Sequence, residues 1–223
     1  MKPEDSRDAV AQVAPAMAAY SEQFIEKDLW NRPELSRRDR SLVTVAALIS
    51  RNDTAELPHY LNVALDSGVK PAEISETITH LAFYAGWPNA TSAALITRQL
   101  FAQRHIDTAS LPGGKVDFLP LDEESENKRA TLVESNFGKV SPGVVKYTTD
   151  ALFQNLWLRP GLAPRDRSLI TVSALVTAGR WPRFLIISTA HGQWFNPDPG
   201  VRSPDATGLC GGLAQCFLGD AGL

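Results

Sequence analysis

Apolar residues recur every three or four positions over much of the first hundred residues, which is the spacing of one face of an α-helix. The first clear set comprises Leu42, Val45, Ala46 and Ile49. Just before it, Ser36 is followed three residues later by Asp39, a pattern that resembles a capping box with the shorter acid. The chain is therefore expected to enter a helix after Ser36 and to bury one side of it.

A second helix is expected directly after the first. Asp53 or Thr54 can cap its start, and Gly68 is suited to end it. Its apolar positions form a single stripe, made of Leu57, Leu61, Ala64 and Leu65. The connection between the two helices is short, which predicts antiparallel packing.

Two more helices complete the predicted unit. Pro71 starts the third, whose apolar residues keep helical spacing until Gly86 and Pro88 close it. The fourth is predicted from about Ala90 to His105. These patterns predict an all-α bundle.

The chain contains an internal repeat. Residues 29–45 recur as residues 156–172, an offset of 127 positions, and the same offset pairs Pro15 with Pro142. Duplication of one helical unit explains this match. We therefore expect a first unit over residues 1–111, a linker over 112–126, and the start of an incomplete second unit over 127–180.

The match between the two copies stops after Arg180. Permissible codons for residues 213–217, read in a shifted frame with the preceding glycine, encode Gly-Trp-Pro-Asn-Ala. This is the sequence of residues 86–90, in the place that the offset predicts. We infer that residues 181–223 are a frame-shifted ending, and we expect them to contain less helix than residues 54–105.

Composition narrows the classes of function. The 223 residues carry a formal net charge of −3, which gives no electrostatic footprint for nucleic acid or for an anionic membrane. No apolar run is long enough to span a bilayer. Cys210 and Cys216 are the only cysteines, so no disulfide framework is expected. No metal-ligand cluster stands out in the sequence. We expect a cytoplasmic protein without nucleic-acid or membrane partners.

Several ordered segments together resemble the carboxymuconolactone decarboxylase family. They are residues 38–42, Glu56, residues 76–80 and residues 84–88, and the resemblance covers residues 13–103 and again 140–180. It implies the all-helical alkylhydroperoxidase D-like fold, duplicated here with an incomplete second copy. It also implies a reaction without metal or organic cofactor. Resembling proteins form ring-like oligomers, so a homo-oligomer is expected.

The family includes thiol peroxidases, which use a Cys-x-x-Cys pair followed by a histidine. In this chain the matching positions hold Asp53, Glu56 and Tyr60. No thiol is present there to form the low-pKa nucleophile that hydroperoxide reduction requires. The sequence therefore disfavours alkylhydroperoxidase activity.

The decarboxylase members act on small carboxylated lactones, and loss of CO₂ from such a substrate leaves an enolate. That reaction requires a proton donor and a nearby cation. Glu76, His80 and Tyr84 stand four residues apart, so they share one helix face. His80 is the predicted general acid or base, and Glu76 is expected to orient it and to raise its pKa. Arg40 is expected to hold the substrate carboxylate, with Tyr84 as a hydrogen-bond donor.

His59 and Trp87 are further predicted substrate-binding residues, and the sequence leaves alternatives open for most of this set. Glu76 and His80 could form a structural hydrogen bond or a subunit contact. Arg40 and its neighbours could form an ion-pair network at a helix start. Trp87 could simply plug the end of a helix. The competing hypothesis for the whole chain is a catalytically silent, oligomer-forming relative.

Overall fold

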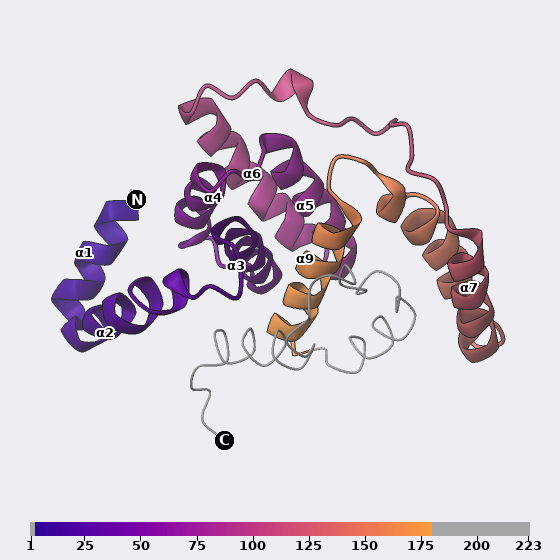
Figure 1. Ribbon diagram of the computed structural model, residues 1–223, viewed down its shortest axis with the longest axis horizontal. Coiled ribbons are helices and arrows are strands. Elements are labelled where there is room, and N and C mark those ends of the chain that lie inside the picture. Colours follow the sequence, from indigo (N-terminus) through magenta and orange to yellow (C-terminus); the bar gives the residue numbers. More distant parts are fainter. Residues whose placement is uncertain (1–2, 180–223) are drawn as a thin grey trace.

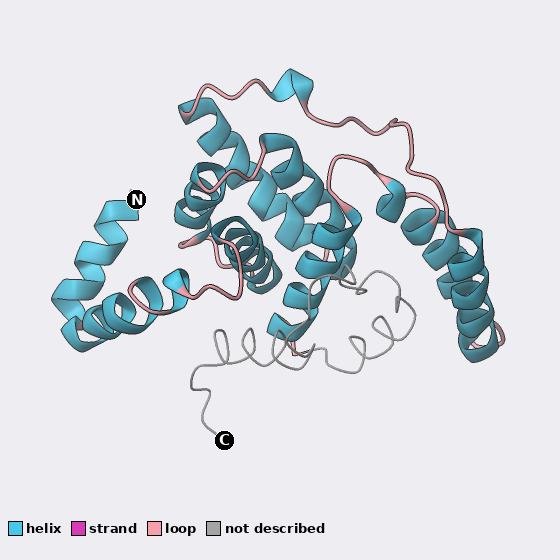
Figure 2. Ribbon diagram, viewed as in Figure 1, coloured by secondary structure: helices cyan, strands magenta, loops and turns pink. Residues whose placement is uncertain are grey.

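The computed structural model describes residues 3–179, and its regular structure is entirely helical (Figure 2). This confirms the predicted all-α class. The predicted frame-shifted ending, residues 181–223, lies outside the described residues. Within the described range, no helix is both long and apolar enough to cross a membrane.

Four helices of the first unit form the centre of the molecule (Figure 1). They are α3 (Arg37–Arg51), α4 (Leu57–Asp66), α5 (Pro71–Tyr84) and α6 (Trp87–Gln103). The Ser36 side chain accepts a hydrogen bond from the Asp39 backbone N–H at 3.1 Å, which confirms the predicted helix start. Between α4 and α5 the chain turns at Gly68, whose φ of +91° is a conformation that favours glycine.

The predicted boundary between the third and fourth helices needs a correction. Gly86 does close α5, with a φ of +101°, but Pro88 lies in the first turn of α6 rather than ending α5. Proline is favoured in the first turn because the N–H it lacks has no partner within the helix there. The fourth helix therefore begins at Trp87, three residues before the predicted start.

Before this bundle lies an arm made of α1 (Pro3–Val13), α2 (Pro15–Tyr20), a π-helical segment (Ser21–Glu26) and a 3₁₀ turn (Leu29–Asn31). The second copy repeats its later part as α8 (Pro142–Tyr147), a π-helical segment (Thr148–Phe153) and a 3₁₀ turn (Leu156–Leu158). Helix α9 (Pro164–Thr177) then repeats α3. The described helices of the second copy thus follow the order of their first-copy counterparts.

The segment between the two copies is shorter than predicted. After a 3₁₀ turn (Thr108–Ser110) the chain is extended, and α7 (Glu123–Phe137) begins inside the predicted linker. The Asp122 side chain caps α7 by accepting a hydrogen bond from the Ser125 backbone N–H at 3.1 Å. The first turn of α7 is acidic, which suits the positive end of the helix dipole. The acids at the end of the predicted linker therefore start a helix.

Helix α9 packs against α3 and α5 and contributes to the same core as the first unit. All four residues of the predicted α3 face are buried. Leu162, Ile170 and Ala174 of the second copy join them in one apolar cluster. Burial of this apolar surface is the main force that holds the second copy against the first. The two copies meet in one continuous core.

Candidate active site

The α5 face that carries Glu76 and His80 is directed at the second copy and is fully buried. Glu76 is 1% exposed and His80 is 0% exposed. Both side chains hydrogen-bond residues that come more than 80 positions later in the chain. The i, i+4 spacing aligned the two residues, and the contact with the second copy determined their partners.

The Glu76 carboxylate binds two guanidinium groups. Arg159 donates to it from Nε at 3.0 Å and from Nη2 at 2.6 Å, and Arg167 donates from Nη2 to Oε2 at 2.6 Å. Burial by itself would raise the pKa of Glu76, but the hydrogen bonds and charges of Arg159 and Arg167 outweigh it and lower that pKa. Glu76 is therefore ionised and held in place by both arginines.

His80 binds Thr171 rather than Glu76. Its Nε2 lies 2.7 Å from Thr171 Oγ1, and the Thr171 hydroxyl donates its hydrogen to the Arg167 carbonyl at 2.7 Å. The hydroxyl oxygen can then only accept, so Nε2 of His80 carries a hydrogen. The other nitrogen, Nδ1, faces Arg167 Nη1 at 3.4 Å and is left as the acceptor.

The predicted effect of Glu76 on His80 is wrong. Burial and the nearby positive charge of Arg167 hold the pKa of His80 well below its usual value of 6.5, so the imidazole is neutral. The prediction failed because both oxygens of Glu76 are engaged by Arg159 and Arg167. Burial is the larger cause of this lowered pKa, and the positive charge that adds to it, Arg167, comes from the second copy.

Two aromatic side chains flank the imidazole. Tyr84 stacks on His80 with ring centroids 4.9 Å apart, and Trp157 meets it edge-on at 5.1 Å. Trp157 Nε1 donates to the Tyr84 hydroxyl at 2.9 Å. Burial raises the pKa of Tyr84 to about 12, with the Trp157 bond acting weakly the other way, so the phenol stays protonated at neutral pH. The site is thus a buried polar cluster bounded by aromatic rings.

The buried cluster of Glu76, His80, Arg159 and Arg167 has an excess of positive charge. One carboxylate faces two guanidinium groups, and the imidazole is neutral, which leaves a net charge of +1 among the four. Arg167 is 0% exposed, and its Nε has no hydrogen-bond partner. An uncompensated buried charge is costly. An anionic ligand would therefore be stabilised here.

Arg40, the predicted carboxylate-binding residue, lies elsewhere. It is buried on α3, where its Nη2 donates to the backbone carbonyls of Arg32 at 2.8 Å and Leu35 at 3.2 Å. Its counterpart at the repeat offset is Arg167, which donates in the same way to the carbonyl of Arg159. The guanidinium groups that contact Glu76 are those of Arg159 and Arg167, and Arg40 is not among them.

The two remaining predicted site residues lie on α4 and α6. His59 is half-buried on α4 and meets Tyr60 edge-on at 4.9 Å. Trp87, at the start of α6, is 60% exposed and packs against Phe83 at 5.0 Å. Trp87 therefore does not line the buried cluster.

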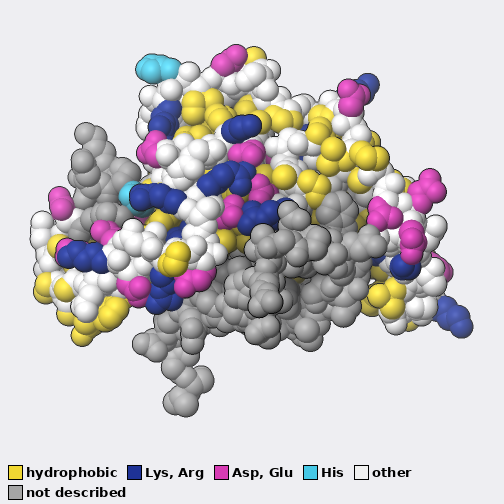
Figure 3. Space-filling model, in the orientation of Figure 1, with side chains coloured by type: hydrophobic (Ala, Val, Ile, Leu, Met, Phe, Trp, Pro, Cys, Tyr) yellow, Lys and Arg dark blue, Asp and Glu magenta, His cyan; other side chains and the backbone are white. Residues whose placement is uncertain are grey.

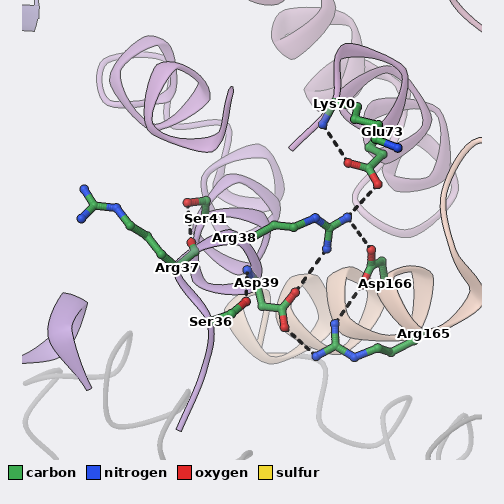
Figure 4. A network of polar contacts seen from close by, with 9 residues as sticks. All are labelled: Ser36, Arg37, Arg38, Asp39, Ser41, Lys70, Glu73, Arg165 and Asp166. Atoms are coloured by element: carbon green, nitrogen blue, oxygen red, sulfur yellow. Dashed lines mark hydrogen bonds and ion pairs between the residues drawn. The ribbon is translucent and has the colours of Figure 1, made fainter. Parts of the chain in front are cut away.

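The start of α3 and the start of α9 form reciprocal ion pairs (Figure 4). Arg38 binds Asp166 at 2.8 Å, and Arg165 binds Asp39 at 2.6 Å. Because Arg165 and Asp166 are the repeat counterparts of Arg38 and Asp39, these contacts relate the two copies by a local two-fold arrangement. Glu73 on α5 also binds Arg38, at 2.7 Å. In the space-filling view, basic and acidic side chains gather over this region (Figure 3).

Sequence reasoning missed four residues of the site, all from the second copy: two members of the cluster, Arg159 and Arg167, and two residues that contact it, Trp157 and Thr171. The repeat contained a signal for them, since it aligns Arg167 with Arg40. What it could not indicate was that one copy supplies the acid and imidazole while the other supplies the cations. Among the described residues, no group of three or more His, Cys, Asp and Glu side chains could hold a metal ion.

Comparison of the sequence with known proteins gives matches over the first helical unit. Residues 15–99 match the model of the carboxymuconolactone decarboxylase family. The chain is 34% identical over 82 residues to a 4-carboxymuconolactone decarboxylase from Acinetobacter baylyi, an alignment that covers 37% of this chain and 61% of that protein. It is 35% identical over 71 residues to a nitrosuccinic acid decarboxylase from Metarhizium robertsii, which covers 32% and 50% respectively. The chain thus matches between half and two thirds of the length of these relatives. Residues 15–99, which hold most of the first helical unit, are thus similar to the carboxymuconolactone decarboxylase family.

Proposed function

We propose that the protein is a decarboxylase of small carboxylated compounds, with a carboxylated lactone or a related ring-cleavage product as its substrate. The observation that carries this proposal is the buried cluster with a net charge of +1 beside the neutral imidazole of His80. Relatives named as decarboxylases of 4-carboxymuconolactone and of nitrosuccinic acid support it, because both names denote acidic substrates.

Arg159 and Arg167 would hold the substrate anion. When the carbon–carbon bond to the carboxylate breaks, its electron pair passes into the adjacent unsaturated system, and CO₂ leaves. The negative charge that develops on the enolate oxygen is then stabilised by a guanidinium group in a site of low dielectric constant. This chemistry uses the chain's own side chains and assigns to Arg167 the role that the sequence suggested for Arg40.

His80 would supply the proton. In the free protein, burial and Arg167 keep the imidazole neutral. A bound substrate carboxylate offsets the positive charge of Arg167, which raises the pKa of His80 and lets it take up a proton from solvent as the substrate enters. The imidazolium then gives this proton to the carbanionic carbon and returns to the neutral state. Tyr84, stacked on the ring, limits its rotation.

The test compares turnover of 4-carboxymuconolactone and of nitrosuccinate by the wild type, His80→Gln and His105→Asn, with loss of absorbance and release of CO₂ as readouts. His105 is exposed and has a φ of +55°, which asparagine tolerates, so this control should keep wild-type turnover. General acid–base catalysis contributes a factor of about 10² to 10⁴. His80→Gln should therefore lower kcat at least about 100-fold, and equal rates in both variants would refute the role of His80.

A second hypothesis is that the cluster is structural and the chain is catalytically silent. The complete burial of Glu76 and His80 supports this hypothesis, since a satisfied buried network also rigidifies a core. It predicts that the wild type turns over neither compound, while His80→Gln still lowers the melting temperature. Turnover by the wild type would exclude it.

We also propose that the protein self-associates through two arms, the one that precedes α3 and its repeat counterpart, which runs from α7 to the 3₁₀ turn Leu156–Leu158. Val13 and Tyr20 on the first arm are 86% and 62% exposed, and their repeat counterparts Val140 and Tyr147 are 85% and 66% exposed. Apolar side chains repeated at matching positions on two arms favour contacts between copies of the chain. Light scattering should give a mass above that of one chain, and Tyr20→Glu with Tyr147→Glu should reduce it. A wild type that stays monomeric would contradict this proposal.

A further inference from the structure

The segment that joins the two copies passes over the buried cluster and is bound to it. This segment, which we call the strap, comprises residues 111–119. Arg159 Nη2 donates to the Gly113 carbonyl at 2.8 Å, and Arg159 Nη1 lies 3.4 Å from the Gly114 carbonyl. Leu119 fastens the far end of the strap, since its N–H donates to the Leu158 carbonyl at 2.7 Å. The strap therefore occupies the donors of Arg159 that Glu76 leaves free.

Among the charged and titratable members of the cluster, Arg159 is closest to solvent. Its side chain is 8% exposed, against 1% for Glu76 and 0% for Arg167. Gly113 and Gly114 are exposed, and a methyl group added to either would meet no atom within 4 Å. The strap is thus a thinly packed cover over a densely packed site, and such segments open locally at low free-energy cost.

A substrate carboxylate and the strap carbonyls would compete for the same donors. Arg159 makes its bonds to Gly113 and Gly114 with neutral carbonyl oxygens, whereas a carboxylate forms shorter, charge-assisted bonds with a guanidinium group. The carboxylate would also neutralise the excess positive charge of the cluster. Replacement of the carbonyls is therefore favourable when an anion of the right size is present.

We propose that Arg159 is the residue at which the substrate carboxylate enters, and that the strap is displaced from Arg159 when it binds. This inference deepens the proposed function and rests on it for the nature of the ligand. The competition for Arg159 exists because the two units are joined covalently: the carbonyls that cover Arg159 belong to the joining segment. Arg159 is thereby a substrate-binding residue, and the strap carbonyls of Gly113 and Gly114 compete with the substrate for its N–H donors.

Limited trypsin digestion tests the proposal, because Lys115 directly follows the two glycines and is exposed. Mass spectrometry would follow cleavage after Lys115, with cleavage after the exposed Lys139 as the internal control. Succinate is the probe, compared with sodium chloride at matched ionic strength. Loss of the bonds to Arg159 should raise cleavage after Lys115 about tenfold and leave cleavage after Lys139 unchanged. Unchanged or slower cleavage after Lys115 would overturn the proposal.

Two variants separate displacement of the strap from general unfolding. Arg159→Met should show fast cleavage after Lys115 without succinate and no further response to it. Leu119→Pro keeps every side chain of the cluster but removes the N–H that binds Leu158, and it should also raise basal cleavage after Lys115 while keeping the succinate response. A Leu119→Pro chain cleaved at the wild-type rate would contradict the anchoring role. Because the readout is proteolysis, a succinate response without decarboxylase turnover would refute the proposed function and leave the assignment of Arg159 standing.

Discussion

Gly161 of the second copy lies close to Glu76 of the first, and its substitution by alanine is a sharp test of the packing at the site. A Cβ added there would lie 2.8 Å from Cγ of Glu76 and 3.1 Å from Cγ of Pro112. The contacted part of Glu76 cannot swing away, because both carboxylate oxygens are held by Arg159 and Arg167. The added methyl group must therefore push the buried acid, the strap, or both.

The magnitude follows from two opposing effects. Alanine restricts the unfolded chain more than glycine does, which stabilises a protein by about 0.4–1 kcal/mol where the backbone conformation permits it. Overpacking a filled site costs about 1–3 kcal/mol. Gly161→Ala should therefore lower the free energy of unfolding by about 1–2 kcal/mol. In a chain of this size that corresponds to a loss of about 2–8 °C in Tm.

Urea unfolding followed by circular dichroism measures this change, and Gly143→Ala is the matched control. Gly143 lies in α8, where an added Cβ meets nothing within 4 Å. That substitution should stabilise the chain by about 0.5–1 kcal/mol, since alanine is the better helix former. A Gly161→Ala protein as stable as Gly143→Ala would show that Glu76 is not held where the structure has it, and the reasoning about the buried cluster would fail.

Two further predictions concern the charges of the cluster. Glu76→Gln leaves two buried guanidinium groups without a counter-charge and should cost about 3–5 kcal/mol in urea unfolding. Glu124→Gln removes an exposed pair with Lys128 and should leave the stability almost unchanged. Similar losses in both variants would contradict the assigned burial. The lowered pKa of His80 predicts that stability falls as pH drops below 6.5, because the unfolded chain then binds a proton that the folded imidazole does not. Between pH 7.5 and pH 5.5 the wild type should lose about 1 kcal/mol more than His80→Gln, and parallel pH profiles would show that His80 titrates normally. The lowered pKa of Glu76 contributes stability that is lost only as the pH falls below its ordinary value of 4.5, so Glu76 does not contribute to the change in this window.

Local signals in the sequence were enough to predict helices α3 to α6 of the first unit, whereas α1 and α2 were not predicted. Ser36 marks a helix start through its own hydrogen bond, and Gly68 marks a turn through its positive φ. Both signals depend on atoms within a few residues, which is why they can be seen without a structure. The prediction failed at residues 123–126, where acids act equally well as linker residues and as the first turn of a helix.

The sequence by itself determined that the chain is helical, that it is duplicated over residues 29–45 and 156–172, and that Glu76, His80 and Tyr84 share one helix face. These properties follow from spacing along the chain. Only the tertiary structure decided that Arg159 and Arg167 hold Glu76, that His80 is neutral, and that residues 111–119 cover the cluster. The physical reason is that charge state and hydrogen-bond partners depend on burial and on distances between residues more than 40 positions apart. No local pattern encodes those distances, because they are set when apolar faces of α3, α5 and α9 pack together.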